Sequence, residues 1–485
     1  MPAPYGQSLA LLTDLYQLTM ACGYWREGMA EREAVFHHYF RRAPFGGSFA
    51  IAAGLETALR WLDDLRFAED DLKYLSGLTG NTGNALFPPH FLSYLERLEF
   101  ACHVDAVPEG TLVLAEEPLV RVQGPLLQCQ LVETALLNQI NFQTLVATKA
   151  ARVCLAARDA PVIEYGLRRA QGIDGGLSAS RAAYIGGCAG TSNTLAGKLY
   201  GIPVKGTQAH SWVLAFDNER EAFEAFARSM PDNLVLLVDT HDSLAGIEKA
   251  IEVGLSARKR GIRLAGIRLD SGDLAALSKQ ARDLLDAAGL GGTAIIASND
   301  LDEHAIERLN ARGARVSAWG VGTSIAAAKG QAALGGVYKL ALLRDRSGTW
   351  EPKAKRSEDA GKSSTPGMLQ VRRFWDGQRP AADLLYDETY HPAGQWAGLG
   401  RSAGAGAEPV TLGGPSEDLL RPVMRRGRRV APAATLSESR SAARDWMHRI
   451  GRKALHAEPG ADAIPFFTET GLAARRSAEL GRDAN

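Results

Sequence analysis

The sequence lacks any excess of charge of one sign. Lysine plus arginine number 55 and aspartate plus glutamate also number 55 in the 485 residues, so the formal net charge is zero. Proteins that bind nucleic acid or an anionic membrane surface carry a basic excess or stripe. No apolar run reaches the roughly 20 residues that span a bilayer, and no basic segment precedes a hydrophobic one at the N-terminus. These absences predict a cytoplasmic protein that binds neither nucleic acid nor membranes.

Cysteine is also scarce, and its distribution excludes two further classes. The five cysteines stand singly, with no CxxC pair and no His/Cys cluster at the spacing of a metal site. An odd number without a framework indicates reduced thiols in a reducing compartment. No Ser–His–Asp arrangement and no carboxylate pair for acid–base catalysis is visible either. Hydrophobic residues make up 46% of the chain, which is enough for two or three domains with large cores.

Short apolar runs alternate with helix-like stretches in the middle of the chain. Strands are expected at 161–166, 234–239, 264–270, 293–298 and 315–320. Helices are expected at 243–259, 274–288 and 302–312. The polar residues Asp239, Asp270, Asn299 and Gly320 end successive strands at spacings of 31, 29 and 21 residues, the length of a strand–helix unit. This pattern predicts an α/β fold with a parallel sheet covered on both sides, whose active site lies at the carboxyl ends of the strands.

The flanking segments have a different pattern. Residues 1–125 mix helical and alternating stretches and predict an α+β segment, whereas 126–340 would form the catalytic α/β barrel domain. Residues 341–397 predict a β-rich segment that packs with the N-terminal one, giving a discontinuous domain. Residues 398–485 are expected to form a Gly/Pro-rich loop and a C-terminal helical tail, with a helix at 434–452 and disorder over the last twenty residues.

Arg268 and Asp270 lie two residues apart in GIRLDSGDL, on an expected strand. Because side chains alternate along a strand, both would point to the same face at its carboxyl end. A guanidinium binds a carboxylate or phosphate, and a carboxylate binds ribose hydroxyls, so the pair suits an anionic, polyhydroxylated ligand. The alternative is a structural ion pair followed by a helix cap at Asp273.

Two further segments have the residue types of a phosphate site. Gly320, Gly322 and Thr323 follow an expected strand in AWGVGTS, where glycines let backbone amides approach a phosphate. An ordinary turn between strand and helix has the same pattern, so the motif alone is not decisive. Thr207 and His210 lie near the end of an expected strand in GIPVKGTQAHS, and a single histidine there is equally compatible with a core or turn residue.

Arginines and one tyrosine complete the set of candidate residues. The glycine-rich segment GLRRAQGIDGGLSASRAAYIGG contains Arg168, Arg169 and Arg181, which suit anion contacts or a solvated face. Tyr16 lies on an expected helix in TDLYQLTM, and its ring can stack on an aromatic ligand. A tyrosine at the edge of the core is the commoner case.

Taken in chain order, these segments resemble nicotinate phosphoribosyltransferase. The resemblance rests on six collinear motifs between about residues 10 and 375, TDLYQLTM, EYGLRRAQGIDGGLSASRAAYIGGCAGTSNTLAGKLYGIPVKGTQAHS, GIRLDSGDL, ASNDLDE, GVGTS and GGVYKL, and KRSEDAGKSSTPGMLQVRRF also fits. It implies an irregular α/β barrel of the type II phosphoribosyltransferase kind beside a discontinuous α+β domain built from the N-terminal segment and the region after the barrel. Two positions depart from the family pattern: His241 stands where an aromatic residue is usual, and Cys188-Ala189 where an aromatic-acidic pair is frequent.

The resemblance also implies a reaction and a role for each candidate residue. Nicotinate and 5-phosphoribosyl 1-pyrophosphate would form nicotinate mononucleotide and pyrophosphate, coupled to ATP hydrolysis, in the first step of NAD salvage from nicotinate. The implied catalytic residues are His210, which ATP would phosphorylate, Arg268 and Asp270. Substrate contacts are implied for Tyr16, Thr207, Arg168 and Arg268, and phosphate contacts for Gly322 and Thr323. The family uses Mg²⁺ and takes ATP as co-substrate, and the resemblance implies no particular residue as a metal ligand. Its members form homodimers with shared active sites.

The chemistry of this reaction agrees with the residues present. The pyridine nitrogen is already a nucleophile at neutral pH, so catalysis requires alignment of the reactants and stabilisation of charge on ribose and pyrophosphate. A pocket with arginines and no acceptor for an amide predicts a preference for nicotinate over nicotinamide. The competing functions are nicotinamide phosphoribosyltransferase, quinolinate phosphoribosyltransferase, whose chain is much shorter, and a catalytically silent ligand-binding homologue.

Overall fold

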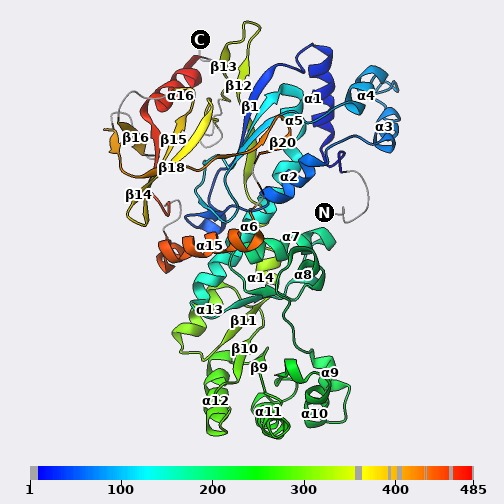
Figure 1. The fold of residues 1–485 in the computed structure, drawn as a ribbon, viewed down its shortest axis with the longest axis vertical. Coiled ribbons are helices and arrows are strands. Elements are labelled where there is room, and N and C mark those ends of the chain that lie inside the picture. The colour runs from blue at the N-terminus through cyan, green and yellow to red at the C-terminus, as the bar shows by residue number, and fades with distance from the viewer. Residues whose placement is uncertain are drawn as a thin grey trace. The chain divides into compact units, whose positions relative to one another are not determined.

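A computed structural model of the chain describes residues 9–355, 363–390, 395–400, 407–430, 432, 434–457 and 462–482. The chain divides into two compact units. Unit 1 combines Met1–Leu145 with Ala333–Asn485, and unit 2 is the inserted segment Val146–Ala332 (Figure 1). The helix α6, Glu133–Ala157, contains the first boundary and is the longest helix of the described chain. Each unit is described by itself below.

Unit 2 is built on a sheet of six parallel strands. In chain order these are β6 Val162–Glu164, β7 Gly190–Thr191, β8 Val235–Leu237, β9 Gly266–Leu269, β10 Ala294–Ala297 and β11 Ala318–Val321. Their order in the sheet is β7-β6-β11-β10-β9-β8. The five strands expected from the apolar runs are present, and the prediction of a parallel sheet is confirmed. The two-residue strand β7 has no such run and was not predicted.

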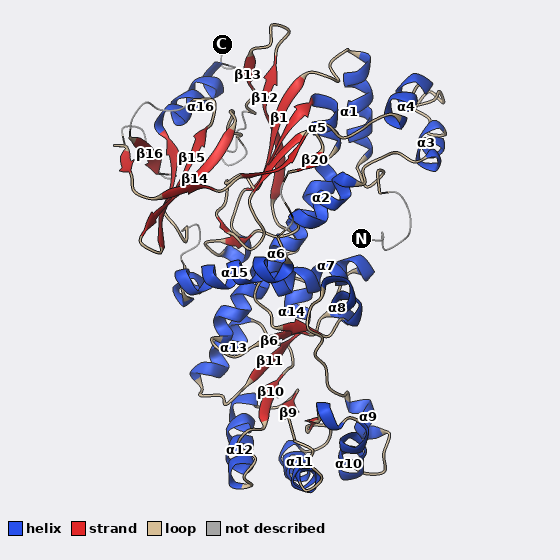
Figure 2. Cartoon of the chain, viewed as in Figure 1, coloured by secondary structure: helices blue, strands red, loops and turns tan. Residues whose placement is uncertain are grey.

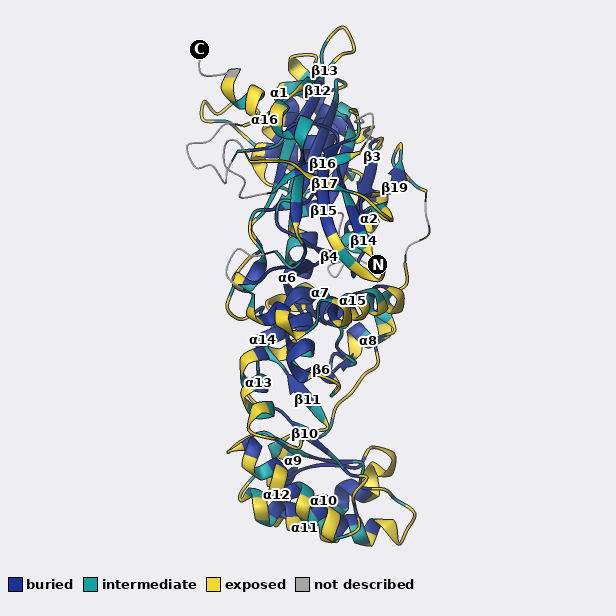
Figure 3. Ribbon diagram, turned by 90° about the vertical axis from the view of Figure 1, so that its left-hand side faces the viewer, coloured by how far each residue is buried: buried dark blue, intermediate teal, exposed yellow. Residues whose placement is uncertain are grey.

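Three helices of unit 2, α11, α12 and α13, begin at an aspartate that follows a strand. The side chains of Asp242, Asp273 and Asp302 accept hydrogen bonds from backbone amides of the first turns of α11, α12 and α13. The helix start predicted at Asp273 is therefore confirmed. The helices are α7 Gly172–Ile185, α8 Thr194–Tyr200, α9 His210–Leu214, α10 Glu219–Ser229, α11 Ser243–Arg258, α12 Leu274–Ala287, α13 Glu303–Ala311 and α14 Thr323–Ala326 (Figure 2). Buried and exposed residues alternate along α11 and α12, as Figure 3 shows in blue and yellow.

A buried ion cluster fastens α13 to α6 within unit 2. Lys149 Nζ lies 2.8 Å from one oxygen of Glu303, and Arg152 Nε lies 3.0 Å from the other. All three side chains are buried. Burial alone would raise the pKa of Glu303, but Lys149 and Arg152 outweigh it and hold the pKa below its ordinary value. The cluster therefore stabilises unit 2 only while Glu303 is ionised.

Unit 1 contains two large sheets and one small one. Its strands are β1 Glu33–Phe40, β2 Ala50–Ile51, β3 His103–Ala106, β4 Leu112–Val113, β5 Val120–Pro125, β12 Gly336–Arg344, β13 Trp350–Pro352, β14 Leu369–Asp376, β15 Arg379–Asp387, β16 Trp396–Gly400, β17 Val410–Leu412, β18 Ser416–Asp418, β19 Arg421–Arg425, β20 Arg428–Arg429 and β21 Phe466–Glu469. The sheet orders are β13-β12-β1-β5-β3-β19-β20, β17-β16-β21-β15-β14-β18 and β2-β4. Because β1 pairs with both β5 and β12, segments from either side of unit 2 share one sheet, the discontinuous arrangement that the sequence predicts.

Helices surround these sheets of unit 1. They are α1 Leu15–Arg26, α2 Leu55–Asp63, α3 Glu69–Ser76, α4 Pro89–Glu96, α5 Leu126–Leu131, α15 Leu436–Ile450 and α16 Thr470–Arg482. The helix expected at 434–452 is α15, whereas α3 was not predicted. No helix among the described residues is long and apolar enough to cross a membrane.

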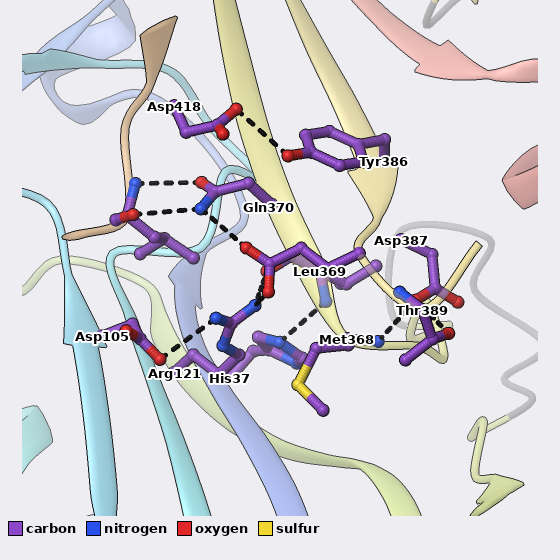
Figure 4. A network of polar contacts seen from close by, with 12 residues as sticks. His37, Asp105, Arg121, Met368, Leu369, Gln370, Tyr386, Asp387, Thr389 and Asp418 are labelled. Atoms are coloured by element: carbon purple, nitrogen blue, oxygen red, sulfur yellow. Dashed lines mark hydrogen bonds and ion pairs between the residues drawn. The ribbon is translucent and has the colours of Figure 1, made fainter. Parts of the chain in front are cut away.

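A polar network joins the two large sheets of unit 1 (Figure 4). Arg121 on β5 donates to Asp105 on β3 at 3.0 Å and to the carbonyl of Leu369 on β14 at 3.2 Å. The amide of Leu369 donates to Nε2 of His37 on β1 at 3.2 Å. Burial and the neighbouring Arg121 lower the pKa of His37 well below its ordinary value, so the ring is neutral and can accept this bond.

The tail differs from the sequence prediction. Residues 398–418, expected as a loop, contribute β16, β17 and β18 to the second large sheet, while 401–406 lie outside the described residues. The last twenty residues, expected to be disordered, contain β21 and α16, and only 483–485 lie outside the described chain. The reason is pairing over long sequence distances, since β21 lies between β15 and β16, and this leaves no local pattern. In the motif KRSEDAGKSSTPGMLQVRRF, residues 356–362 lie outside the described residues.

Candidate active site

Arg268 is the centre of a polar cluster at the carboxyl end of β9. Its side chain is 14% exposed, and Nη2 donates to Asp270 Oδ1 at 2.9 Å. Nε donates to Ser298 Oγ at 2.8 Å. Nη1 lies 3.4 Å from Thr207 Oγ1 and 3.3 Å from the carbonyl oxygen of Gln208. Arg268 and Asp270 thus lie together at the end of the strand, as the alternation predicts, and four partners fix the guanidinium.

Asp270 is held as a carboxylate by this cluster. The Ser298 hydroxyl at the end of β10 also donates to Oδ1 of Asp270, so one serine bridges the ion pair. Burial alone would raise the pKa of Asp270, but the hydrogen bonds from Ser298 and Arg268 outweigh it and lower the pKa. The site therefore presents an ionised carboxylate, which accepts hydrogen bonds from hydroxyl groups.

Asp239, at the end of β8, supplies a second carboxylate. Its Oδ2 accepts hydrogen bonds from the backbone amide of Asp270 and from the Ser271 hydroxyl, both at 2.7 Å. Its Oδ1 is buried and has no hydrogen-bond partner among the described residues. This oxygen therefore keeps the capacity to accept a further hydrogen bond or to contact a cation.

His210 begins the helix α9, so the expectation that it lies near the end of a strand is wrong. The segment before it makes only an isolated bridge, Thr191 with Val204, and residues 205–209 form a loop that contains Thr207. His210 Nε2 lies 3.8 Å from Asp270 Oδ2, and Nδ1 lies 3.1 Å from Thr240 Oγ1. The side chain is 42% exposed. Its ring is accessible to a ligand while the opposite nitrogen is anchored.

The glycine turn after β11 lies against the end of β6. A Cβ atom at Gly320 would approach the Tyr165 ring to 2.6 Å, so only glycine fits beside that ring. The same ring lies 5.8 Å from the guanidinium carbon of Arg268. Gly322 directly precedes α14, of which Thr323 is the first residue. Tyr165 therefore links the turn to the Arg268 cluster.

Two further candidate residues make no hydrogen bond or ion pair with this cluster among the described residues. Arg168 is on the short 3₁₀ turn Leu167–Arg169 in unit 2, is exposed, and makes no hydrogen bond or ion pair with the residues that the structure describes. Tyr16 belongs to unit 1, where it is 48% exposed on α1. The roles of both residues stay predictions.

Four residues of the cluster were not predicted as site residues: Tyr165, Asp239, Thr240 and Ser298. Each comes at or directly after the carboxyl end of a strand, where side chains of neighbouring parallel strands converge. That position was the available signal, and of these four residues only Asp239 had been noted as a polar strand end. Bridging by Ser298 depends on the sheet order β10-β9, which the sequence does not specify.

A parallel sheet whose carboxyl ends carry a fixed arginine and two carboxylates, with a histidine beside them, defines an α/β protein with a polar site at the strand ends. Comparisons with known proteins place it more closely. Family models match residues 11–141, as the nicotinate phosphoribosyltransferase N-terminal domain, and residues 162–379, as the nicotinate phosphoribosyltransferase family. The chain belongs to the nicotinate phosphoribosyltransferase family.

Individual relatives support this assignment over most of the chain. A Bacillus subtilis nicotinate phosphoribosyltransferase is 45% identical over 386 residues, which cover 79% of this chain and 77% of the relative. A Mycobacterium tuberculosis relative of the same name is 42% identical over 439 residues, covering 90% and 86%. The crystal structure of human nicotinic acid phosphoribosyltransferase matches with a TM-score of 0.83 at 33% identity, covering 96% and 99% of the two chains. The resemblance inferred from the six motifs is thereby confirmed.

Proposed function

We propose that this protein transfers a 5-phosphoribosyl group from 5-phosphoribosyl 1-pyrophosphate to the ring nitrogen of nicotinate. The C–N bond forms as the C–O bond to pyrophosphate breaks, and nicotinate mononucleotide and pyrophosphate leave, the first step in NAD salvage from nicotinate. The observation that carries the proposal is the Arg268–Asp270–His210 cluster at the carboxyl ends of the parallel strands. This cluster would supply a contact for the carboxylate of nicotinate, for the positive charge on the ribose ring and for the phosphoryl group of ATP.

Arg268 and Asp270 would hold the two reacting partners in line. The guanidinium has four protein partners and one further N–H, so it can donate to the carboxylate of nicotinate without moving. The ionised Asp270 would accept from the ribose hydroxyls and stabilise positive charge on the ribose ring. Thr207, beside Arg268, would contact the pyridine. Alignment of this kind accounts for a large share of the rate in two-substrate reactions.

Gly322 and Thr323 would bind the 5-phosphate. The turn has no side chain at Gly322, and the hydroxyl of Thr323 donates to no other described residue, so both are available to a phosphate oxygen. The exposed guanidinium of Arg168, which has no ion pair among the described residues, would add a charged contact.

His210 would carry the phosphoryl group of ATP. A neutral imidazole attacks the γ-phosphorus, ADP leaves, and the N–P bond is later broken by water, which releases inorganic phosphate. Thr240 occupies Nδ1, so Nε2, on the side of Asp270, is the free nucleophile. ATP hydrolysis would thus be coupled to phosphoribosyl transfer by the same cluster that binds the ribose.

Mg²⁺ suits the carboxylates of this site. No group of three or more His, Cys, Asp or Glu side chains in the described chain forms a metal cage of its own. Mg²⁺ instead takes one or two carboxylates together with substrate phosphates. Asp239, with its unpartnered buried oxygen, and the adjacent Asp270 fit that requirement. When bound, the ion would offset the charge of the departing pyrophosphate.

The proposal also includes the barrel architecture, the homodimer and the cellular location. The six-stranded sheet would be part of an irregular α/β barrel, which the bridge from β7 to Val204 supports by extending the sheet beyond its edge. Tyr16, exposed on α1, would stack on the pyridine in a homodimer with shared active sites. A cytoplasmic location agrees with the five cysteines, none of which forms a disulfide in the described chain.

The proposal is tested by offering pyridine substrates one at a time with 5-phosphoribosyl 1-pyrophosphate, with and without ATP. Nicotinate mononucleotide should form fastest from nicotinate and faster with ATP. Turnover of nicotinamide at a comparable kcat/KM would favour the nicotinamide enzyme instead. Binding of nicotinate without any product would identify a silent homologue.

A further inference from the structure

A cavity lies in unit 2, at the amino ends of strands whose carboxyl ends form the cluster above. It has a volume of about 280 Å³. Its walls come from the connection that enters β9, including Arg258, Ile262, Arg263 and Leu264, and from the turn 289–293 that enters β10. Leu264, in the wall of this basal pocket, precedes Arg268 by four residues of extended chain, which span about 13 Å.

Arginines surround the turn of the basal pocket. Arg258 Nη1 donates to the carbonyl of Gly289 at 3.2 Å, and Arg263 Nη2 donates to the carbonyl of Gly292 at 2.7 Å. Arg282 donates to two further carbonyls of the same turn at 2.8 and 3.2 Å. Each of the first two guanidinium groups uses a single donor, so most of its five N–H groups stay available. The carbonyls fix the guanidinium groups without neutralising them.

The charge of this region is not compensated. Arg258, Lys259, Arg260 and Arg263 fall within six residues that contain no acid, and none of them makes an ion pair with the described residues. Among the described residues, the one ion pair at the turn is that of Arg282 with Asp286 at 2.9 Å. Unpaired guanidinium groups around a concave surface are the donors that bind phosphate in proteins.

A purely structural explanation accounts for part of this arrangement. Arg258 lies in the last turn of α11, where a cation interacts favourably with the helix dipole. The helix dipole is equivalent to about half a negative charge at this end, whereas the segment contains four cations, so the dipole cannot balance them. Moreover, Arg258 and Arg263 donate to the turn before β10 rather than to the carbonyls that end α11. The dipole therefore does not explain why both arginines line the cavity.

We propose that the basal pocket is a second binding site, for a small organic phosphate. Arg258 and Arg263 would bind the phosphate group. Two buried leucines, Leu264 and Leu290, together with the half-buried Ile262, form an apolar surface in the same pocket for the organic part. The backbone amides of Gly291 and Gly292 donate to no described residue and add neutral donors at the rim.

Hydrogen exchange located by mass spectrometry tests the site directly, with phenyl phosphate as the probe. In the full-length protein at 150 mM salt, phenyl phosphate at twice its Kd should slow exchange about threefold in peptides covering 258–264 and 289–293. Inorganic phosphate should bind more weakly, because it leaves the apolar surface uncovered. Peptides at the carboxyl ends of the strands report the proposed active site separately.

Two double variants with equal loss of charge separate a pocket from a diffuse basic surface. Arg258→Ala/Arg263→Ala should lose the protection, whereas Lys259→Ala/Arg260→Ala, outside the pocket lining, should retain it. Arg258→Lys/Arg263→Lys keeps the charge and should retain part of it, which covers the case that the alanine variant is unstable. Absence of protection in the unmodified protein, or an equal loss in both alanine variants, would overturn the proposal.

Discussion

Arg268→Ala removes a guanidinium that contacts four protein groups and, under the proposed function, the substrate carboxylate. Loss of a charge-assisted contact in a desolvated site costs about 2–5 kcal/mol. At 1.36 kcal/mol per factor of ten, kcat/KM for nicotinate should fall between about 30-fold and about 5,000-fold. The 14% exposure of the side chain favours the upper half of that range.

The same substitution should change the pH dependence of the reaction. Arg268 is one of the groups that lower the pKa of Asp270, so its removal raises that pKa while burial continues to act. If the carboxylate form of Asp270 is required, the acid limb of kcat/KM moves to higher pH in the variant. A residue with only a structural role would not shift this limb.

Steady-state kinetics over a pH series, with thermal unfolding of each variant, provide the measurement. Arg282→Ala is the matched control, because Arg282 also bonds two carbonyls and a carboxylate in unit 2, but at the amino ends of the strands. Arg268→Lys keeps the positive charge but loses the planar guanidinium with its paired N–H donors, so its kcat/KM should lie between those of the wild type and the alanine variant. Near-normal kcat/KM in Arg268→Ala, or a loss equal to that of Arg282→Ala with an unmoved acid limb, would refute the assigned role.

Three further outcomes are expected. His210→Asn should abolish nicotinate-stimulated ATP hydrolysis and the acid-labile phosphate on the protein, while slow ATP-independent transfer remains; intact coupling would exclude the phosphohistidine. Nicotinate should have a higher kcat/KM than nicotinamide. Because Asp270 already pairs with Arg268, binding the neutral amide would leave no isolated charge, so the preference should be about 10- to 150-fold, the value of one charged hydrogen bond. Equal kcat/KM values for the two pyridines would contradict this prediction. Glu303→Ala removes the carboxylate that pairs with two buried cations and should lower the free energy of unfolding by about 3–5 kcal/mol. Since the folded pKa of Glu303 is lowered, the wild-type contribution should be present at neutral pH and be lost as pH falls through that pKa, which urea titrations at several pH values would measure.

The sequence predicts best what local periodicity controls. The alternation in GIRLDSGDL correctly places Arg268 and Asp270 together, and Asp273 marks the start of α12. The five apolar runs are strands because the strands of a parallel sheet are buried on both faces. Family resemblance then adds residue roles that no periodicity contains.

Features that depend on distant partners were missed. Ser298 joins the site only because β10 lies beside β9, and nothing in TAIIAS indicates that neighbour. His210 begins a helix instead of following a strand, since the bridge at Val204 does not continue. In the tail, glycines and prolines suggested a loop, although β16 and β21 are held in a sheet by partners far away in sequence.

The insertion of unit 2 into unit 1 has a consequence for synthesis on the ribosome. All strands of the parallel sheet have been synthesised once the chain reaches Val321. The strand β1, in contrast, cannot pair with β12 until some 300 further residues have been synthesised, as the pairing of Phe36 with Leu340 shows. Domains generally fold as units during translation, so the inserted unit can complete its sheet while β1 still presents an open edge. A nascent or truncated chain that ends before Gly336 should therefore carry a finished catalytic sheet and an aggregation-prone first sheet, and chaperones should engage the earlier-made half of the molecule.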